Sequence, residues 1–296
     1  MNPEIKKILV PVDLSESSTA ALETAKVLAK KLNAEIALLH VLVFNDYYFS
    51  IVPEVRSILP SIKEIELAAQ KQMEEISSTI KKDSGINASV FVTTGNIEKE
   101  VFDFCKREKM DLIVMGTHGT SGYREHFIGS NAQRVVTLSK IPVLTIQGNA
   151  TKNEFKNIMV PIDNSLHSRE KLNIAIDFAE LFGSKIHLLG LSDSADKKDL
   201  ELFKVKLSPV EKLLTEKNIN YETVILPGEN VANAALKYAG DSKCDLIVIN
   251  TGHESKTTGI FLGTFAQQIV NHSKVPVLSY RHTEGEYLID TQGYGI

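Results

Sequence analysis

The sequence predicts an α/β protein of two similar domains, each an open five-stranded parallel sheet with helices on both faces. Three observations support this fold class. The chain has 296 residues, enough for about two domains. Much of it is repeated once, and in both copies short apolar runs alternate with amphipathic stretches of helical period. Near-continuous apolar strands separated by helices are typical of parallel sheets covered on both sides.

The repeat has a long period. KKILVPVDLSESS at 6–18 aligns with KNIMVPIDNSLHS at 156–168, and DLIVMGT at 111–117 aligns with DLIVINT at 245–251. The offset between the aligned segments is smaller for the second pair than for the first. The second copy is therefore shorter than the first between these two segments. A period this long indicates duplicated domains rather than a solenoid of short repeats.

The boundary between the copies falls in QGNATKNE at 147–154, where the residues are polar and small. We therefore expect a first domain at 1–148, a second domain at 154–281 and a polar tail at 282–296.

Each element of the first copy follows from its pattern. β-Branched apolar runs predict strands, apolar residues at helical spacing predict helices, and Ser15 or Ser17 is a suitable N-cap for the first helix. The expected order is strand 6–12, helix 17–32, strand 34–43, helix 61–82, strand 88–94, helix 97–109, strand 111–116, helix 130–140 and strand 141–147.

The second copy repeats this order. The expected elements are strand 157–163, helix 168–183, strand 185–191, helix 199–217, strand 221–226, helix 230–240, strand 245–250, helix 264–272 and strand 276–280.

Composition excludes several classes of function. The formal net charge of −4 is unfavourable for non-specific binding to nucleic acid, which relies on clustered Lys and Arg. The two cysteines, Cys105 and Cys244, form no CxxC, so neither a disulfide framework nor a thiolate metal site is expected. The start of the chain lacks a signal-peptide pattern, and no apolar run approaches the roughly 18 residues of a membrane helix. We therefore expect a cytoplasmic protein that does not bind membranes.

The stretch DLIVMGTHGTSGYREHFIGSNAQRVV, at 111–136, contains more glycines than a plain turn needs. Glycine lets backbone approach a ligand closely, and a helix N-terminus attracts phosphate because its first amides lack partners. Gly129, Ser130 and Asn131 open a predicted helix, and Gly116 and Gly119 precede them. This arrangement predicts a phosphate site.

The position in the sheet agrees with a ligand site. In open α/β sheets, ligands bind at the carboxyl ends of strands, where the strand order reverses. Pro11, Val12 and Asp13 follow the first strand, and Val41 lies at the end of the second. Neither a GxxxxGK[ST] loop nor a GxGxxG turn is present, so the common phosphate loops do not apply.

These segments resemble the universal stress protein family. The resemblance is carried by ILVPVD, DLIVMGTHG, GSNA and PVLTI, and the spacing Gly116-x2-Gly119-x9-Gly129-Ser130 is similar to that family's ATP-binding pattern. It covers nearly all of both copies. It implies two Rossmann-like domains of the adenine nucleotide α-hydrolase-like kind. It also implies that the last strands of the copies, PVLTI and PVLSY, pair within the chain, and the need to cover exposed strand edges is a physical reason to expect this. Further homodimerisation is a separate possibility.

The resemblance also implies a set of contacts with ATP, which Mg2+ would accompany. Asp13 and Val41 would hold the adenine and ribose. Pro11, Val12 and Met115 would lie beside them, and Gly116, Gly119, Gly129, Ser130 and Asn131 would hold the ribose and phosphates. One departure is Leu14, where the family often has glycine after the aspartate. The resemblance supplies no catalytic residue.

The second copy departs more. Asn250 and His253 replace the first two motif glycines, and Thr264-Phe265 replaces Ser130-Asn131, whereas Gly263 is kept. Side chains at 250 and 253 would fill the space that a ribose-phosphate needs. We therefore expect the second copy to be mainly structural.

Other interpretations remain open at this stage. Asp13 could simply cap the first helix, His118 could be an ordinary loop histidine, and His40 could be a packed strand histidine. The aromatic segment at 44–60 could be a lid or a subunit contact. The leading function is an ATP-binding regulatory protein. The alternatives are a slow ATP hydrolase, since positioning and metal ions supply much of phosphoryl-transfer catalysis, and a nucleotide-free interaction scaffold.

Overall fold

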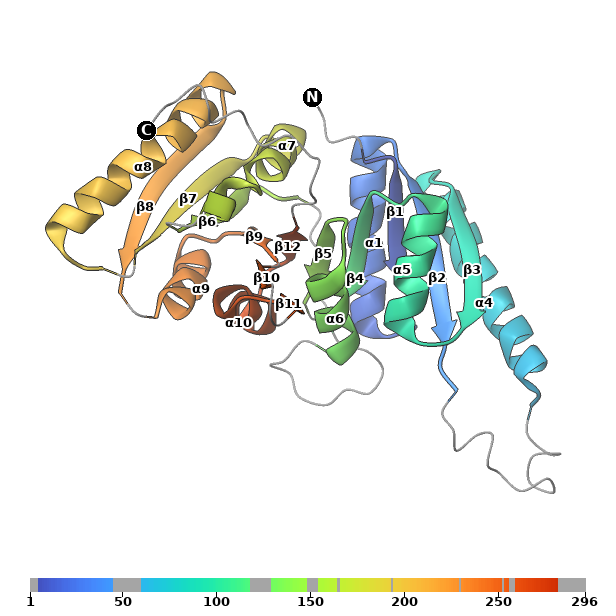
Figure 1. The fold of residues 1–296 in the computed structure, drawn as a ribbon. Helices are drawn as coiled ribbons and strands as arrows, with labels where there is room; N and C mark the ends of the chain where they lie inside the picture. Colours follow the sequence, from blue (N-terminus) through green and yellow to red (C-terminus); the bar gives the residue numbers. More distant parts are fainter. Residues whose placement is uncertain are drawn as a thin grey trace.

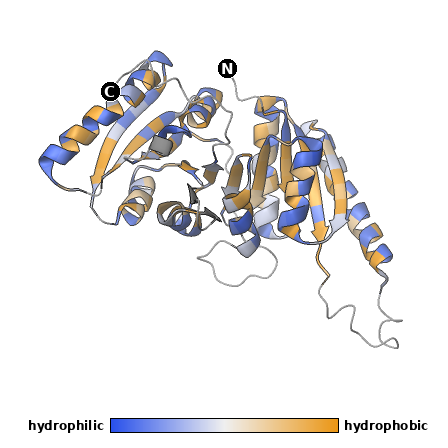
Figure 2. Ribbon diagram, viewed as in Figure 1, coloured by the Kyte–Doolittle hydropathy of each residue, from blue (hydrophilic) through white to orange (hydrophobic). Residues whose placement is uncertain are grey.

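The computed structural model describes residues 5–44, 60–117, 129–147, 154–163, 166–192, 194–228, 230–251, 253–255 and 259–281. Within these ranges, strands and helices alternate in two halves that meet at a central pair of strands (Figure 1). Figure 2 shows the pattern behind this arrangement, with mainly hydrophobic strands and helices that carry both kinds of residue. The predicted α/β fold class is confirmed.

The first half follows the predicted order of elements. Ser15 caps the first helix, where its side chain accepts a hydrogen bond from the Ser18 amide. The elements are β1 Lys7–Pro11, α1 Glu16–Leu32, β2 Glu35–Leu42, α4 Ile62–Ser84, β3 Ala88–Thr94, α5 Ile97–Glu108, β4 Leu112–Gly116, α6 Ser130–Leu138 and β5 Val143–Ile146.

The second half repeats this order with two changes. The helix expected to begin at 168 begins four residues later, after a short 3-10 helix, and a small hairpin follows β9. The elements are β6 Asn157–Ile162, η1 Leu166–Arg169, α7 Leu172–Phe182, β7 Lys185–Ser192, α8 Lys197–Glu216, β8 Asn220–Pro227, α9 Val231–Asp241, β9 Leu246–Asn250, β10 His253–Ser255, β11 Gly259–Phe261, α10 Thr264–His272 and β12 Val277–Tyr280.

The main strands form one ten-stranded sheet in the order β3-β2-β1-β4-β5-β12-β9-β6-β7-β8. Pairing is parallel within each half. At the centre β5 and β12 pair antiparallel, with Leu144 opposite Leu278. The carboxyl ends of the strands in the two halves therefore lie at opposite edges of the sheet.

Two layers of helices cover the sheet. On one face α1 and α4 share a hydrophobic cluster with α7 and α8, and on the other face α5 and α6 share one with α9 and α10. Both clusters continue across the junction, so the halves have common cores. No helix in the described part of the chain is long and apolar enough to cross a membrane.

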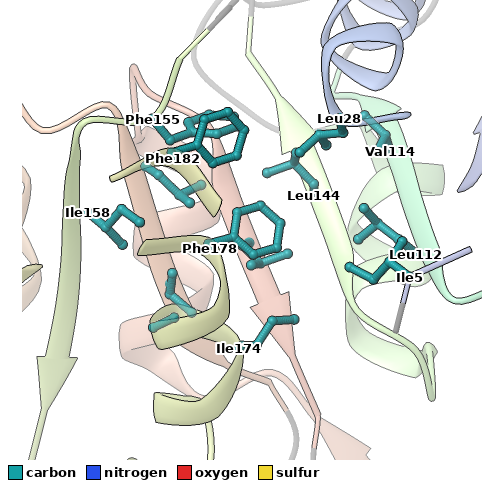
Figure 3. Close-up of a cluster of buried hydrophobic side chains, with 14 of the residues drawn as sticks. Ile5, Leu28, Leu112, Val114, Leu144, Phe155, Ile158, Ile174, Phe178 and Phe182 are labelled. Atoms are coloured by element: carbon teal, nitrogen blue, oxygen red, sulfur yellow. The ribbon is translucent and has the colours of Figure 1, made fainter. Parts of the chain in front are cut away.

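Aromatic side chains of the second half fill the junction on the α1 and α7 face. Phe155, Phe178 and Phe182 form a group that faces Leu28 and Leu144 of the first half (Figure 3). The rings of Phe155 and Phe182 meet edge to face, with centroids 5.1 Å apart. Burial of such side chains is the main stabilising contribution to a junction of this kind.

Candidate functional site

The candidate site lies at the carboxyl edge of the first half, between β1 and β4. These strands are neighbours, with Ile8 opposite Leu112. The chain leaves β1 for α1 on one face of the sheet and leaves β4 for α6 on the other. The strand order reverses at this point, and it is here that open α/β sheets bind ligands.

The topology brings most of the predicted site residues to this edge. Pro11 ends β1, and Val12 and Asp13 follow it. The ends of β2 and β4 and the start of α6 contribute Val41, Met115, Gly116, Gly129, Ser130 and Asn131. Gly119 lies outside the described residues, as do His118 and most of the aromatic segment expected at 44–60. The direct contact of these residues with a nucleotide stays a prediction.

Helix α6 begins without a side-chain cap. Gly129 is its N-cap residue, no side chain in the described chain bonds to its first turn, and that turn contains no acidic residue. The Gly129 amide donates to the Thr117 carbonyl at 2.6 Å, which joins the helix start to the end of β4. Ser130 and Asn131 are exposed. Among the described residues, no side-chain cap competes for the first amides of α6, and such a helix start favours an anion.

Five of the other described helices, α1, α4, α5, α8 and α9, do begin with a side-chain cap. Their N-cap side chains accept hydrogen bonds from first-turn amides, as in the case of Ser15, Ser61, Asn96, Asp196 and Asn230. Helix α10, which aligns with α6 in the second half, also begins with an uncapped glycine, Gly263. Helix α7 also lacks a side-chain cap, at Lys171, so the feature that α6 and α10 share is an N-cap glycine after the fourth strand of each half.

Asp13 braces the turn between β1 and α1. Its Oδ1 accepts hydrogen bonds from the Ser15 amide at 3.0 Å and from the Ser15 hydroxyl at 2.5 Å. The residue between them, Leu14, has φ 65°. This left-handed conformation is unfavourable for leucine and costs glycine nothing, which gives a physical reason for the glycine expected at this position. The helix cap itself is Ser15 rather than Asp13.

Gly116 has a role that the sequence did not reveal. A Cβ atom at this position would lie 2.3 Å from Ser17 Oγ and 2.6 Å from the Ser17 carbonyl carbon. The first turn of α1 therefore packs directly against the end of β4, and only glycine permits that approach. The missing side chain thus makes room for the first turn of α1, and a contact of the Gly116 backbone with ribose or phosphate stays a prediction.

The sequence predicts a packed or satisfied histidine at His40. In the structure, the partner of this side chain is the Val12 backbone in the candidate site. Its Nδ1 lies 2.6 Å from the Val12 carbonyl oxygen. Because a carbonyl can only accept, Nδ1 is the donor. The Val12 amide in turn donates to the Leu39 carbonyl at 2.9 Å. Both backbone groups of Val12 are thus held by β2.

At the corresponding edge of the second half, the connection from the first strand to the first helix is different. Asn250 stands where Gly116 stands in the first half, and the chain enters α7 through the 3-10 helix Leu166–Arg169. Lys171, which aligns with the buried Ala21, is itself buried, and its Nζ donates to the Ser168 carbonyl at 2.5 Å. Burial lowers the pKa of Lys171 to about 8, an effect that the charge of Asp163 partly offsets.

A second polar cluster lies at the opposite, amino edge of the second half. Glu222 accepts hydrogen bonds from Lys185 at 2.5 Å and from Tyr238 at 2.8 Å, and its Oε1 is 2.7 Å from His187 Nδ1. Burial lowers the pKa of His187 and raises that of Tyr238 to about 12. The groups satisfy one another, and within the described ranges no cluster of His, Cys, Asp or Glu could hold a metal ion. We therefore regard this network as structural.

Parallel strands covered by helices on both faces, with the strand order reversing between β1 and β4, place the protein in the Rossmann-like class. Comparison with known proteins narrows this class. The model of the universal stress protein family matches residues 4–147 and again residues 154–281. The chain therefore belongs to the universal stress protein family and contains two copies of its domain.

Two shorter relatives each match about half of the chain. Universal stress protein MJ0577 of Methanocaldococcus jannaschii is 29% identical over 159 residues, which cover 50% of this chain and 98% of that one. Universal stress protein YxiE of Bacillus subtilis is 31% identical over 156 residues, which cover 48% of this chain and 98% of that one.

Several solved structures match nearly the whole chain. A universal stress protein from Archaeoglobus fulgidus superposes with a TM-score of 0.75 and covers 94% of this chain and 98% of its own. The two sequences are 22% identical, so this match supports the fold alone.

Proposed function

We propose that the protein is an ATP-binding regulatory protein that holds one nucleotide in its first half and uses its second half mainly as structure. The observation that carries this proposal is the start of α6. It is an uncapped helix N-terminus without acidic residues, and it lies at the switch point beside the Asp13 turn. This combination favours an anionic ligand, and the family resemblance specifies an adenine nucleotide.

The proposed arrangement assigns each part of the nucleotide to a different element. The phosphates would lie against the first amides of α6, with the Ser130 hydroxyl as an additional donor. The adenine and ribose would lie toward Asp13 and Val41, across the ends of β1 and β2. Mg2+ would be held mainly by phosphate oxygens and water, because the first turn of α6 offers no carboxylate.

The pairing of β5 with β12 suggests a second part of the proposal. We infer that each half serves the other as a built-in partner, so that the chain is a pseudo-dimer at its centre. Within one chain, the antiparallel pair leaves neither of these strands as an open edge. Light scattering should therefore find the same mass when the concentration is changed, unless another surface forms a homodimer.

The first test asks whether the purified protein carries nucleotide. The protein is denatured, and the released small molecules are separated by chromatography. We expect up to one adenine nucleotide per chain, and calorimetric titration of nucleotide-free protein with ATP should give the same stoichiometry. Absence of both release and heat would contradict the proposal.

A charge substitution at the helix start tests the location. Ser130→Asp places a carboxylate at the first residue of α6, where it repels phosphate but stabilises the helix through its dipole. We expect the affinity for ATP to fall at least about tenfold, equivalent to about 1.4 kcal/mol, without loss of thermal stability. Thr264→Asp at the aligned position of α10 is the matched control and should leave ATP binding unchanged. Equal effects of the two substitutions would place the nucleotide elsewhere.

A further inference from the structure

We propose that His40 is a positioning residue of the nucleotide site, which fixes the Val12 backbone and through it the Asp13 turn. This inference rests on the proposed function and adds to it a residue that lies outside the predicted contact set. His40 acts from the neighbouring strand β2 and is assigned no contact with the nucleotide.

The first support is the geometry around Val12. The Val12 amide donates to Leu39, and the His40 ring donates to the Val12 carbonyl at 2.6 Å. Val12 lies one residue beyond the end of β1, so the His40 side chain extends the β1–β2 ladder by one further bond. The carbonyl direction that it fixes sets the start of the peptide leading to Asp13.

The second support is strain in the turn that follows. Leu14 is held at φ 65°, a conformation that leucine leaves unless its surroundings restrain it. On the far side, the restraint is the bonding between Asp13 and Ser15. On the near side, it is the fixed backbone of Val12. Loss of the His40 bond would therefore let this turn relax and move the Asp13 side chain.

The third support is a comparison within the chain. Gly190 occupies the position of His40 in the second half, opposite Ile162 in the β6–β7 register. A Cβ at Gly190 would lie 2.8 Å from the ring of Phe203, so an apolar ring covers this position. The histidine is thus present in the half that keeps the glycine motif. Gly190 replaces it in the half that lacks the glycine motif and in which a 3-10 helix follows the first strand.

The experiment compares substitutions that keep or remove the donor. His40→Asn places an amide nitrogen close to the position of Nδ1, whereas His40→Phe keeps a ring and removes the donor. His40→Leu is a second donor-free variant, so the comparison does not depend on the folding of one protein. ATP affinity is measured by calorimetry, and the melting temperature is measured in parallel.

We expect His40→Phe and His40→Leu to weaken ATP binding about fivefold to tenfold, the size expected for one net hydrogen bond. His40→Asn should restore affinity to within about threefold of the original protein, since it retains the donor. His187→Phe, a strand histidine of the second half, is the control, and it should lower the melting temperature without changing ATP affinity.

The outcomes separate this inference from the proposed function. If the unmodified protein binds ATP and the donor-free variants bind it equally well, the inference is wrong and the proposed function stands. The inference is also wrong if His40→Asn binds as weakly as His40→Phe. If the unmodified protein does not bind ATP, the proposed function fails and this inference fails with it.

Discussion

The two halves of the chain leave their first strands in different ways. In the first half, the Asp13 turn leads into α1 at Glu16, and the start of that helix packs against Gly116. In the second half, a 3-10 helix leads into α7 at Leu172, and a buried lysine lies beside it. The strand order around both regions is the same. The residue at the end of the fourth strand is Gly116 in the first half and Asn250 in the second. This difference is sufficient to explain why α7 cannot begin at the place where α1 begins.

The largest expected effect comes from making the first half resemble the second at this position. Gly116→Asn should destabilise the protein by about 3 kcal/mol, because its Cβ would overlap the Ser17 backbone. It should also abolish ATP binding, since the turn at Asp13 precedes the displaced helix start. Urea denaturation and calorimetric titration measure the two effects.

The reverse substitution provides the control. Asn250→Gly in the second half should change stability by less than about 1 kcal/mol and leave ATP binding intact, because α7 already begins farther along the chain. If Gly116→Asn proved as mild as Asn250→Gly, the explanation of the difference between the halves would be wrong.

A smaller effect is expected at the buried lysine. The pKa of Lys171 in the folded protein, about 8, lies below the ordinary value of 10.5, so folding favours the neutral amine. The free energy of unfolding is therefore unaffected by this shift above about pH 10.5, where the lysine is neutral in both states. It falls as the pH drops toward 8, because the unfolded chain then binds the proton more readily than the folded protein does. Lys171→Met should therefore stabilise the protein at pH 7 by about 2 kcal/mol.

The pH dependence makes this prediction specific. The advantage of Lys171→Met should shrink as the pH rises from 8 toward 10.5, over which the lysine recovers about 3 kcal/mol. Lys204→Met, at an exposed position of α8, should change stability by less than about 0.5 kcal/mol at either pH. A constant advantage across this range would mean that burial of the charge is not the cause.

The smallest effect is expected at Leu14. Leu14→Gly removes the strain of a left-handed leucine but increases the freedom of the unfolded chain, for a net gain of about 0.5–1 kcal/mol. Lys109→Gly is a matched control, because Lys109 ends α5 with φ 53°. Both substitutions should raise the melting temperature, whereas only Leu14→Gly should also change ATP affinity. Loss of stability at both positions would contradict the role given to strain.

The sequence predicted the elements that depend on local pattern. Ser15 acts as one of the two expected caps because a hydroxyl at that point can reach the first amides of the helix. The helix after Gly129 and the apolar strands also lie where periodicity placed them. The family and the fold class, which combine many such local signals, were therefore predictable.

Features that depend on contacts between distant segments were not predictable in this way. Gly116 and Ser17 are far apart in sequence, so their close approach had no local signal, and neither did the bond from His40 to Val12. Lys171 lies in a helical pattern that gave no indication of its burial. An alignment of the two copies does mark all three positions. Gly116 aligns with Asn250, His40 aligns with Gly190, and Lys171 aligns with Ala21.

The antiparallel junction of β5 and β12 has an evolutionary consequence. In an assembly of identical subunits, a substitution at the position of Gly116 would strike both sites at once. Fusion of the two copies into one polypeptide removes that symmetry constraint while it fixes their ratio at one to one. One copy can then lose its ligand contacts and still provide the strand on which the other copy depends, so that a single gene encodes two specialised halves.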